Sequence, residues 1–196
     1  MNCSHALFSV RTTVDQYTSN DSGVIICLLD ISKAFDKVNR YALFNKLIDR
    51  KVPANIIQLL FIWYRNASSI VCWDKVLSKS YILHSGVRQG GVISPVLFAV
   101  YVNNLLLKVQ QSKLGCYINH VPMSIFMFAD DLALVAPSIT HLCKMMEICH
   151  DELAELDMKL NINKTQCIGF GKTFSKAQQH FLVEYCYLPW CFSQIW

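Results

Sequence analysis

Charged residues are scarce in this chain, and several features that would assign it to a class at once are missing. Only 16% of its 196 residues are charged and 53% are hydrophobic, a balance that argues against an intrinsically disordered chain. The nine cysteines are scattered, mostly within apolar segments, and show no paired framework. No charged and then apolar leader opens the sequence. These absences predict a reduced, intracellular setting.

Long apolar stretches and internal repeats are also lacking. The longest uncharged apolar run, Val92–Leu107, is too short and too polar to predict a membrane span. No repeat, low-complexity segment or linker divides the chain, so its length predicts one domain with a core of its own. The net charge of +4 permits a nucleic-acid partner without requiring one, and no membrane partner is expected.

A pair of adjacent acids lies between two short apolar runs in the segment Ser124–Ala136, SIFMFADDLALVA. The runs are rich in Ile, Phe, Leu and Val and lack helical spacing. They therefore predict two β-strands, with Asp130 and Asp131 at the connection of a hairpin. Asp is also common in turns because it hydrogen-bonds its own backbone, and for this pair alone that explanation is the better one. A third acid changes the balance.

The third acid ends another apolar strand. Residues Val24–Asp30, VIICLLD, form a continuous aliphatic run that predicts a central strand covered on both faces. This strand and the hairpin can bring Asp30, Asp130 and Asp131 to one sheet edge, where three carboxylates repel one another without a cation. Hard oxygen ligands at this density favour Mg²⁺, and two such ions can assist a phosphoryl displacement. A glycosidase-type pair is disfavoured because adjacent acids on one turn cannot flank a sugar ring.

The remaining segments predict further helices and strands. Ser138 is placed to cap a helix that runs to about Leu160, and a helix packed on one side is indicated within residues 1–22. The other expected elements are helices at 41–50, 53–64 and 96–109, short strands within 69–83, a helix start at Ser94-Pro95, and a turn and last strand at 161–171. Phe61, Trp63 and Tyr64 could stack on bases, but their helical spacing favours packing.

Four segments together resemble the palm of reverse transcriptases. They are LLDISKAFD (28–36), SGVRQGGVISPVLF (85–98), FADD (128–131) and LNINKT (160–165), and their order and intervals also match. The style is that of non-LTR (LINE-type) retrotransposons. One motif alone would be weak evidence, whereas four in one order, over roughly residues 5–170, are highly specific. The resemblance implies an α+β palm-like fold, a mostly antiparallel sheet with helices packed on one face.

The resemblance also implies roles for the acids. Asp30 resembles the first metal-ligating acid, Asp130 its partner in bridging two Mg²⁺ ions, and Asp131 the third acid of the box, so all three are implied catalytic residues. The backbone of Ile31 is implied as a further metal ligand, and Mn²⁺ as a possible substitute for Mg²⁺. The implied activity is that of an RNA-directed DNA polymerase, in which a primer 3′-hydroxyl attacks the α-phosphorus of a dNTP.

A second set of residues is implied to bind the nucleotide. Its members are Ser32, Lys33, Ala34, Phe35, Gln89, Gly90 and Lys164. The turn after Asp30 would offer backbone N–H groups to the triphosphate. Phe35 would discriminate against a 2′-hydroxyl, although a core role for this ring is nearly as well supported. Gly86, Gln89 and Gly90 match positions that contact nucleotide and template, and Lys164 matches a lysine that stabilises or protonates the departing pyrophosphate.

The resemblance covers a partial domain. Residues 1–171 correspond to the palm with a remnant of the fingers, and residues 172–196 form a tail without recognisable resemblance. The implied partners are template RNA, DNA primer or target, and dNTPs; the implied location is nuclear or cytoplasmic, and fingers and thumb would come from the same longer chain. Two other interpretations stay open: a catalytically inactive palm remnant with at most weak nucleic-acid binding, and another metal-dependent phosphotransferase using the same acids.

Overall fold

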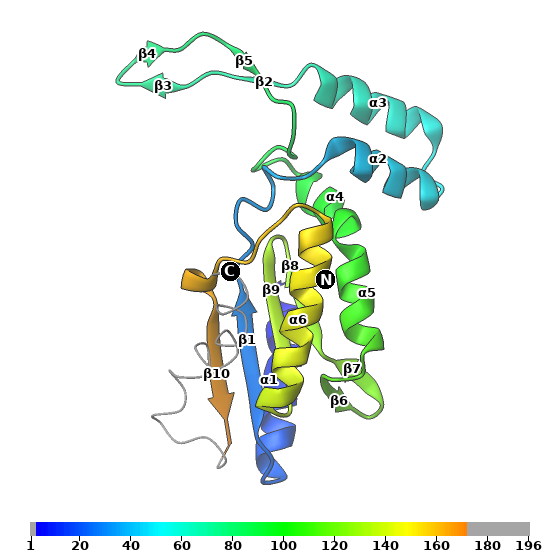
Figure 1. Ribbon diagram of the computed structural model, residues 1–196, viewed down its shortest axis with the longest axis vertical. Helices are drawn as coiled ribbons and strands as arrows, with labels where there is room; N and C mark the ends of the chain where they lie inside the picture. Colours follow the sequence, from blue (N-terminus) through cyan, green and yellow to red (C-terminus); the bar gives the residue numbers. More distant parts are fainter. Residues whose placement is uncertain (1–2, 172–196) are drawn as a thin grey trace, which may run out of the picture. The chain divides into compact units, whose positions relative to one another are not determined.

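The computed structural model describes residues 3–171, and these residues fall into two compact units (Figure 1). Unit 1 consists of residues 3–32 and 102–171, and unit 2 of residues 33–101. The sequence predicts one domain over residues 1–171; that extent stays a prediction, and the expected tail at 172–196 lies outside the described residues. Within residues 3–171, no helix has the length and apolar character needed to cross a membrane.

A four-stranded antiparallel sheet lies at the centre of unit 1 (Figure 1). Its strands, in spatial order, are β10 (Gln166–Phe170), β1 (Val24–Leu29), β9 (Asp131–Ala136) and β8 (Ile125–Phe128). Cys27 of β1 pairs with Cys167 on one side and with Leu134 on the other. The predicted central strand, the hairpin that carries the two acids, and the last strand are all confirmed.

Helices cover both faces of this sheet, not one face as expected. The further elements of unit 1 are α1 (Cys3–Ser19), α5 (Asn103–Gln111), α6 (Ile139–Glu155), the 3₁₀ turn η1 (Ile162–Lys164) and a small hairpin of β6 (Cys116–Ile118) and β7 (Val121–Met123). Because side chains alternate along a strand, Val24 and Cys27 point to opposite faces. Val14 and Tyr17 of α1 pack on the face of Val24, whereas α6 lies over the other face (Figure 1). The α+β class is confirmed, and the one-sided arrangement is corrected.

Helix α6 begins where the sequence predicts and ends earlier. The Ser138 hydroxyl oxygen accepts a hydrogen bond from the His141 amide at 3.3 Å, which confirms the cap. The last helical residue is Glu155, not Leu160, because Asp157 takes a φ of +55° and turns the chain out of the helix.

The helix expected at 96–109 is in fact two helices. α4 (Ser94–Tyr101) belongs to unit 2 and begins at the predicted serine, whereas α5 belongs to unit 1. Val102 separates them with φ −93° and ψ 8°, outside the helical region. The carbonyl of Tyr101 accepts a hydrogen bond of 2.8 Å from the ammonium group of Lys46. A residue far away in the sequence thus binds the backbone where the helix stops.

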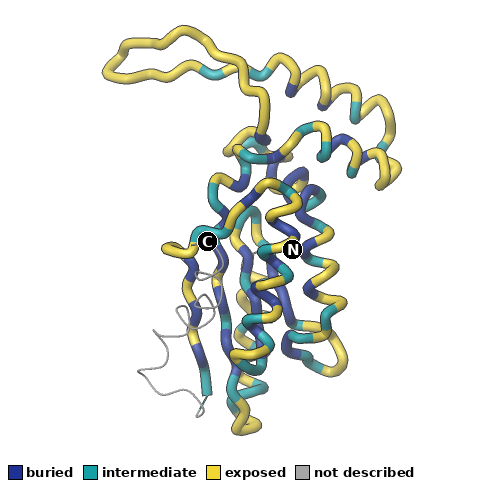
Figure 2. The backbone as a smooth tube through the Cα atoms, in the orientation of Figure 1, coloured by how far each residue is buried: buried dark blue, intermediate teal, exposed yellow. Residues whose placement is uncertain are grey.

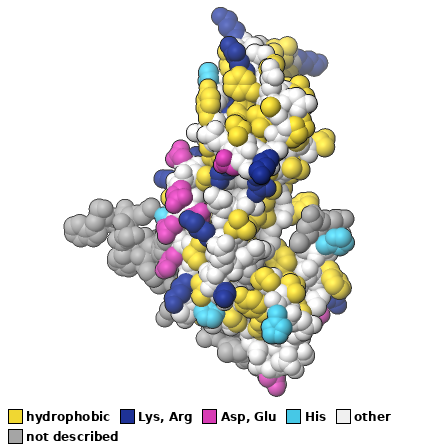
Figure 3. Space-filling view, turned by 90° about the vertical axis from the view of Figure 1, so that its right-hand side faces the viewer, with side chains coloured by type: hydrophobic (Ala, Val, Ile, Leu, Met, Phe, Trp, Pro, Cys, Tyr) yellow, Lys and Arg dark blue, Asp and Glu magenta, His cyan; other side chains and the backbone are white. Residues whose placement is uncertain are grey.

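Unit 2 consists of helices and a long two-stranded projection. Its elements are α2 (Arg40–Asp49), α3 (Ala54–Arg65), β2 (Ser68–Ser69), β3 (Cys72–Trp73), β4 (Val76–Leu77), β5 (Tyr81–Ile82) and α4. The rings of Phe44 and Phe61 pack at 5.8 Å between centroids, and they join α2 to α3. Tyr64 is buried, as its predicted packing role requires, whereas Trp63 is 61% exposed. Many apolar side chains gather over the upper part of Figure 3, where these helices lie.

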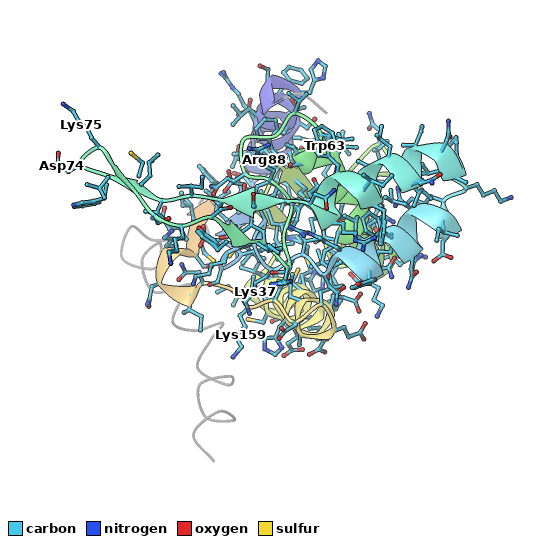
Figure 4. The ribbon with its side chains drawn as sticks, turned by 90° about the horizontal axis from the view of Figure 1, so that it is seen from above. Lys37, Trp63, Asp74, Lys75, Arg88 and Lys159 are labelled. Atoms are coloured by element: carbon cyan, nitrogen blue, oxygen red, sulfur yellow. The ribbon has the colours of Figure 1, made fainter. Side chains whose placement is uncertain are left out.

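The projection, which we call the arm, comprises residues 66–85. Its base is closed by the pairing of β2 with β5 and its far part by that of β3 with β4. Asp74 and Lys75 form the turn at its free end (Figure 4). Figure 2 shows the arm as almost wholly exposed, and Trp73 in it is 82% exposed. The arm therefore has no core of its own.

Candidate active site

The two adjacent acids lie at the tip of the β8–β9 hairpin. Asp131 is the first residue of β9 and pairs with Phe128, so only Ala129 and Asp130 connect the strands. Ala129 has a φ of +56°, a left-handed conformation that is costly for a residue with a Cβ. This tight and strained turn determines where both carboxylates leave the sheet.

Asp30 joins the two acids because β1 is the neighbour of β9. It directly follows β1, whose Leu29 pairs with Leu132, one residue beyond Asp131. Partial burial raises the pKa of Asp131, and the negative charges of Asp130 and Asp30 raise it further. The sheet therefore brings the three acids that the sequence singles out to one edge.

These acids concentrate negative charge without forming a closed metal cage. Among residues 3–171, no three His, Cys, Asp or Glu side chains are close enough together to hold an ion. Mg²⁺ prefers carboxylate oxygens, but it commonly takes one or two of them and completes its coordination with water and substrate phosphate. The donor set of this edge therefore fits a cation shared with a substrate better than a structural ion.

A lysine faces the same edge. Lys164 Nζ lies 4.0 Å from Oδ2 of Asp30, and its side chain is 70% exposed. Two backbone hydrogen bonds hold its segment beside β1: the Ser32 amide donates to the carbonyl of Lys159 at 2.9 Å, and the Asn161 amide donates to the carbonyl of Asp30 at 2.8 Å. The ammonium group is thus held near the acids and open to a phosphate.

Ile31 and Ser32 have different backbone environments. Ile31 is buried and forms an isolated antiparallel bridge with Leu160. The hydrogen bonds of that bridge use the backbone of Ser32 and Asp30, so the carbonyl of Ile31 takes no part in them. The Ser32 amide already donates a hydrogen bond to the carbonyl of Lys159. Ser32 would therefore contact a nucleotide through its side-chain hydroxyl.

The next turn, at the start of unit 2, offers backbone donors. The amides of Lys33, Ala34 and Phe35 have no hydrogen-bond partner among the described residues. Lys33 has a φ of +52°, which is unusual for a residue other than glycine. Successive unpaired amides in a turn form a concavity that attracts anions. The amides of Lys33 and Phe35 are therefore candidates for the predicted triphosphate contact, whereas the Ser32 amide is engaged and Ala34 is buried.

Phe35 is tied to the glycine loop of the second motif. Its ring packs on that of Phe98 at 5.2 Å between centroids, and its carbonyl accepts a 2.8 Å hydrogen bond from the Val87 amide. Gly86 has a φ of +84°, and a Cβ there would lie 2.9 Å from the backbone of Phe35 and Asp36. Gly86 is thus required because the loop packs closely against the backbone of residues 35 and 36.

The tip of the same loop is exposed. Arg88, Gln89 and Gly90 all face solvent, and Gly90 requires glycine only for its φ of +78°, since nothing lies within 4 Å of a Cβ there. The Ser94 hydroxyl donates to the carbonyl of Arg88 at 2.6 Å, which fastens the loop to the start of α4. The loop presents polar groups outward on a fixed base.

The residues singled out from the sequence are thus divided between the two units. Unit 1 carries Asp30, Ile31, Ser32, Asp130, Asp131 and Lys164, and unit 2 carries Lys33, Ala34, Phe35, Gln89 and Gly90. Sequence reasoning missed Arg40, which the structure places at the base of the glycine loop. Its position at the start of a predicted helix could have drawn attention to it, because a cation there is unfavourable and needs a compensating partner.

Comparisons with known proteins find a matching family and several similar proteins. The model of the family "Reverse transcriptase (RNA-dependent DNA polymerase)" matches residues 2–182. The chain is 28% identical over 144 residues to the Pol polyprotein of the type-2 retrotransposable element R2DM of Drosophila melanogaster, covering 74% of this chain and 14% of that protein. It is 32% identical over 112 residues to the R2 polyprotein of Popillia japonica, covering 55% and 18%. The chain thus spans less than a fifth of these relatives.

Solved structures share the fold. Telomerase from Candida albicans, in complex with a fragment of telomeric RNA, superposes with a TM-score of 0.65 at 15% identity, covering 90% of this chain and 32% of that chain. Apo telomerase from Candida tropicalis, truncated of its C-terminal domain, gives a TM-score of 0.61 at 17% identity, covering 90% and 36%. At these identities the likeness shows the fold alone.

Proposed function

Because the chain belongs to the reverse transcriptase family, we propose that it carries the nucleotidyl-transfer site of an RNA-directed DNA polymerase of a non-LTR retrotransposon. The observation that carries this proposal is the meeting of three carboxylates and a lysine at one edge of an antiparallel sheet. In the proposed reaction, the primer 3′-hydroxyl oxygen bonds to the α-phosphorus of a dNTP and pyrophosphate leaves. Template RNA, DNA primer or target and dNTPs are the proposed partners.

Two Mg²⁺ ions, for which Mn²⁺ can substitute, are the proposed cofactors. Asp30, Asp130 and Asp131 would hold them, with the carbonyl of Ile31 as a further donor. When bound, the ions supply charge neutralisation for the attacking and leaving oxygens. The raised pKa of Asp131 supports this assignment, because its neighbours' negative charges are a cause that a nearby cation would offset.

The other proposed roles follow from where the side chains and amides lie. Lys164, beside Asp30 and largely exposed, would stabilise or protonate the departing pyrophosphate. The amides of Lys33 and Phe35 would bind the triphosphate, and the ring of Phe35 would exclude a 2′-hydroxyl. Gln89 and Gly90, on the exposed loop, would contact nucleotide and template.

A second candidate is a non-catalytic palm that retains the fold. The observation in its favour is that the acids do not form a metal cage within residues 3–171. Primer extension separates the two candidates. The purified chain is assayed on a poly(rA)/oligo(dT) template with Mg²⁺, beside Asp130→Asn and a control variant, Asp151→Asn, whose carboxylate is 77% exposed on α6.

The polymerase proposal expects extension by the wild type and by Asp151→Asn. It expects a loss of at least about 100-fold in Asp130→Asn, because charge stabilisation by bound metal contributes several kcal/mol to such reactions. Circular dichroism checks that each variant is folded. Equal extension by Asp130→Asn would refute the assignment of this acid, and a folded wild type that extends no primer would favour the non-catalytic candidate.

A further inference from the structure

Arg40, the first residue of α2, binds four backbone carbonyl groups. Its Nε donates to Gly86 O at 2.9 Å and one Nη donates to Ser85 O at 2.9 Å. The other Nη donates to Tyr64 O at 2.8 Å and also to Leu83 O. The guanidinium group also lies over the ring of Tyr64, 5.1 Å from its centroid. Four of its five N–H donors are thus accounted for by carbonyls of one unit.

The positive charge of Arg40 lies in an electrostatically unfavourable position. A cation at a helix N-terminus is repelled by the helix dipole. Partial burial lowers the pKa of Arg40, although a guanidinium stays charged. No carboxylate lies within ion-pair distance of it among residues 3–171. The carbonyl groups are therefore what compensates for the cost of placing arginine here.

The four carbonyls belong to the two ends of the arm. Tyr64 lies in the last turn of α3, just before the arm begins, whereas Leu83, Ser85 and Gly86 lie where the arm returns and the glycine loop starts. A single planar group thus joins both ends of the arm to the start of α2. Lysine, with one ammonium on a flexible stem, cannot reproduce this fork of donors.

Further hydrogen bonds connect the same place to the proposed nucleotide residues. The Ser85 hydroxyl donates to Asp36 O at 3.1 Å, and the Gly86 amide donates to Val38 O at 2.8 Å. The Val87 amide binds the carbonyl of Phe35. Displacement of residues 83–86 would therefore shift the base of the glycine loop relative to Phe35.

We infer that Arg40 is a positioning residue that sets the glycine loop, with Gln89 and Gly90, against Phe35, and so controls both dNTP affinity and the preference for deoxyribose over ribose. Its side chain acts through the carbonyls it binds. The nucleotide part of this inference rests on the proposed function, whereas the positioning part does not. Two experiments separate these parts.

The first experiment is amide hydrogen exchange on the folded chain, without nucleotide. Arg40→Lys should speed exchange at Gly86 and Val87 by at least about tenfold, the change expected from loss of one charge-assisted hydrogen bond. Amides inside α6 should be unaffected. Arg65→Lys, at an exposed arginine of the same unit, is the matched control and should leave exchange unchanged. Unaltered exchange at Gly86 and Val87 in Arg40→Lys would overturn the positioning role.

The second experiment is single-nucleotide primer extension with dNTP and with rNTP. Arg40→Lys should raise the KM for dNTP and lower the dNTP-to-rNTP preference, each by about three- to tenfold, a smaller change than in exchange because only part of the lost hydrogen-bond energy reaches the nucleotide. A merely structural role would reduce the active fraction, and so kcat, with KM and preference unchanged; that result would overturn the inference while the proposed function stands. A wild type without extension would remove the nucleotide role together with the proposed function.

Discussion

Two hairpins of this molecule have similar turns and different surroundings. The β8–β9 hairpin turns through Ala129 at a φ of +56°, and the tip of the arm turns through Asp74 and Lys75 at φ of +44° and +65°. None of these residues is glycine, so both turns are strained. The strands behind them differ: β9 is six residues long and largely buried, whereas β3 and β4 have two exposed residues each.

The comparison separates turn formation from turn positioning. A short two-stranded hairpin can close a tight turn, but in isolation it is at best marginally stable. The β8–β9 turn is anchored through β9, which pairs with both β8 and β1. Only this anchored turn can hold carboxylates at constant distances from Asp30. The arm can present side chains but depends on Arg40 at its base for its position.

The largest expected contrast concerns one leucine in each hairpin. Leu134 in β9 is fully buried and Leu77 in β4 is 65% exposed. Leu134→Ala should lower the free energy of unfolding by about 2–5 kcal/mol, because it removes buried methyl groups and leaves a cavity. Leu77→Ala should change it by less than about 0.5 kcal/mol. Urea unfolding followed by circular dichroism measures both, and similar losses would show that the arm is packed.

Thiol reactivity should sharpen the same contrast. Cys72 in the arm is exposed, whereas Cys116 and Cys149 in unit 1 are buried. Burial raises the pKa of Cys116 to about 11 and that of Cys149 to about 12. At neutral pH each buried thiol should react at least roughly 100-fold more slowly than an ordinary exposed one, since only the thiolate is nucleophilic. Iodoacetamide labelling read by peptide mass spectrometry tests this; comparable labelling of Cys72 and Cys149 would contradict it.

The smallest expected effect is the pH dependence contributed by Asp131. Its raised pKa means that, just above the ordinary carboxyl value, the folded chain binds more protons at this group than the unfolded chain. Stability should therefore fall as the pH rises from that value through the raised pKa, and level off above it. Asp131→Asn should flatten this part of a urea-unfolding series, whereas the control Asp151→Asn should not.

A carbon-detected NMR titration, which follows the side-chain carboxyl shift with pH, gives the pKa of Asp131 directly. Asp130→Asn should lower it by removing one of the two neighbouring charges, and added Mg²⁺ should lower it as well. If the pKa of Asp131 responds to neither change, the charges near the hairpin tip do not interact with its carboxylate.

The site was predictable where its determinants are local. Runs of apolar residues predicted β1, β8 and β9, and the acids at their ends followed from the same runs. The cap at Ser138 was readable because a cap is a contact between residues three apart, and the helix start at Ser94 followed from the residues around it. Patterns of side-chain alternation and capping are short-range, and a sequence displays them directly.

What the sequence determined by itself, then, is the four strands of the central sheet, the hairpin with its acids and the α+β class. What the tertiary structure decided depends on hydrogen bonds between distant residues. Three such contacts are the Lys46 ammonium at the carbonyl of Tyr101, the Lys159 carbonyl at the amide of Ser32, and the Arg40 guanidinium at the base of the arm. They fall between residues dozens of positions apart or more. No local periodicity records them, because their partners are backbone carbonyls, which every residue carries, and backbone amides, which every residue except proline carries.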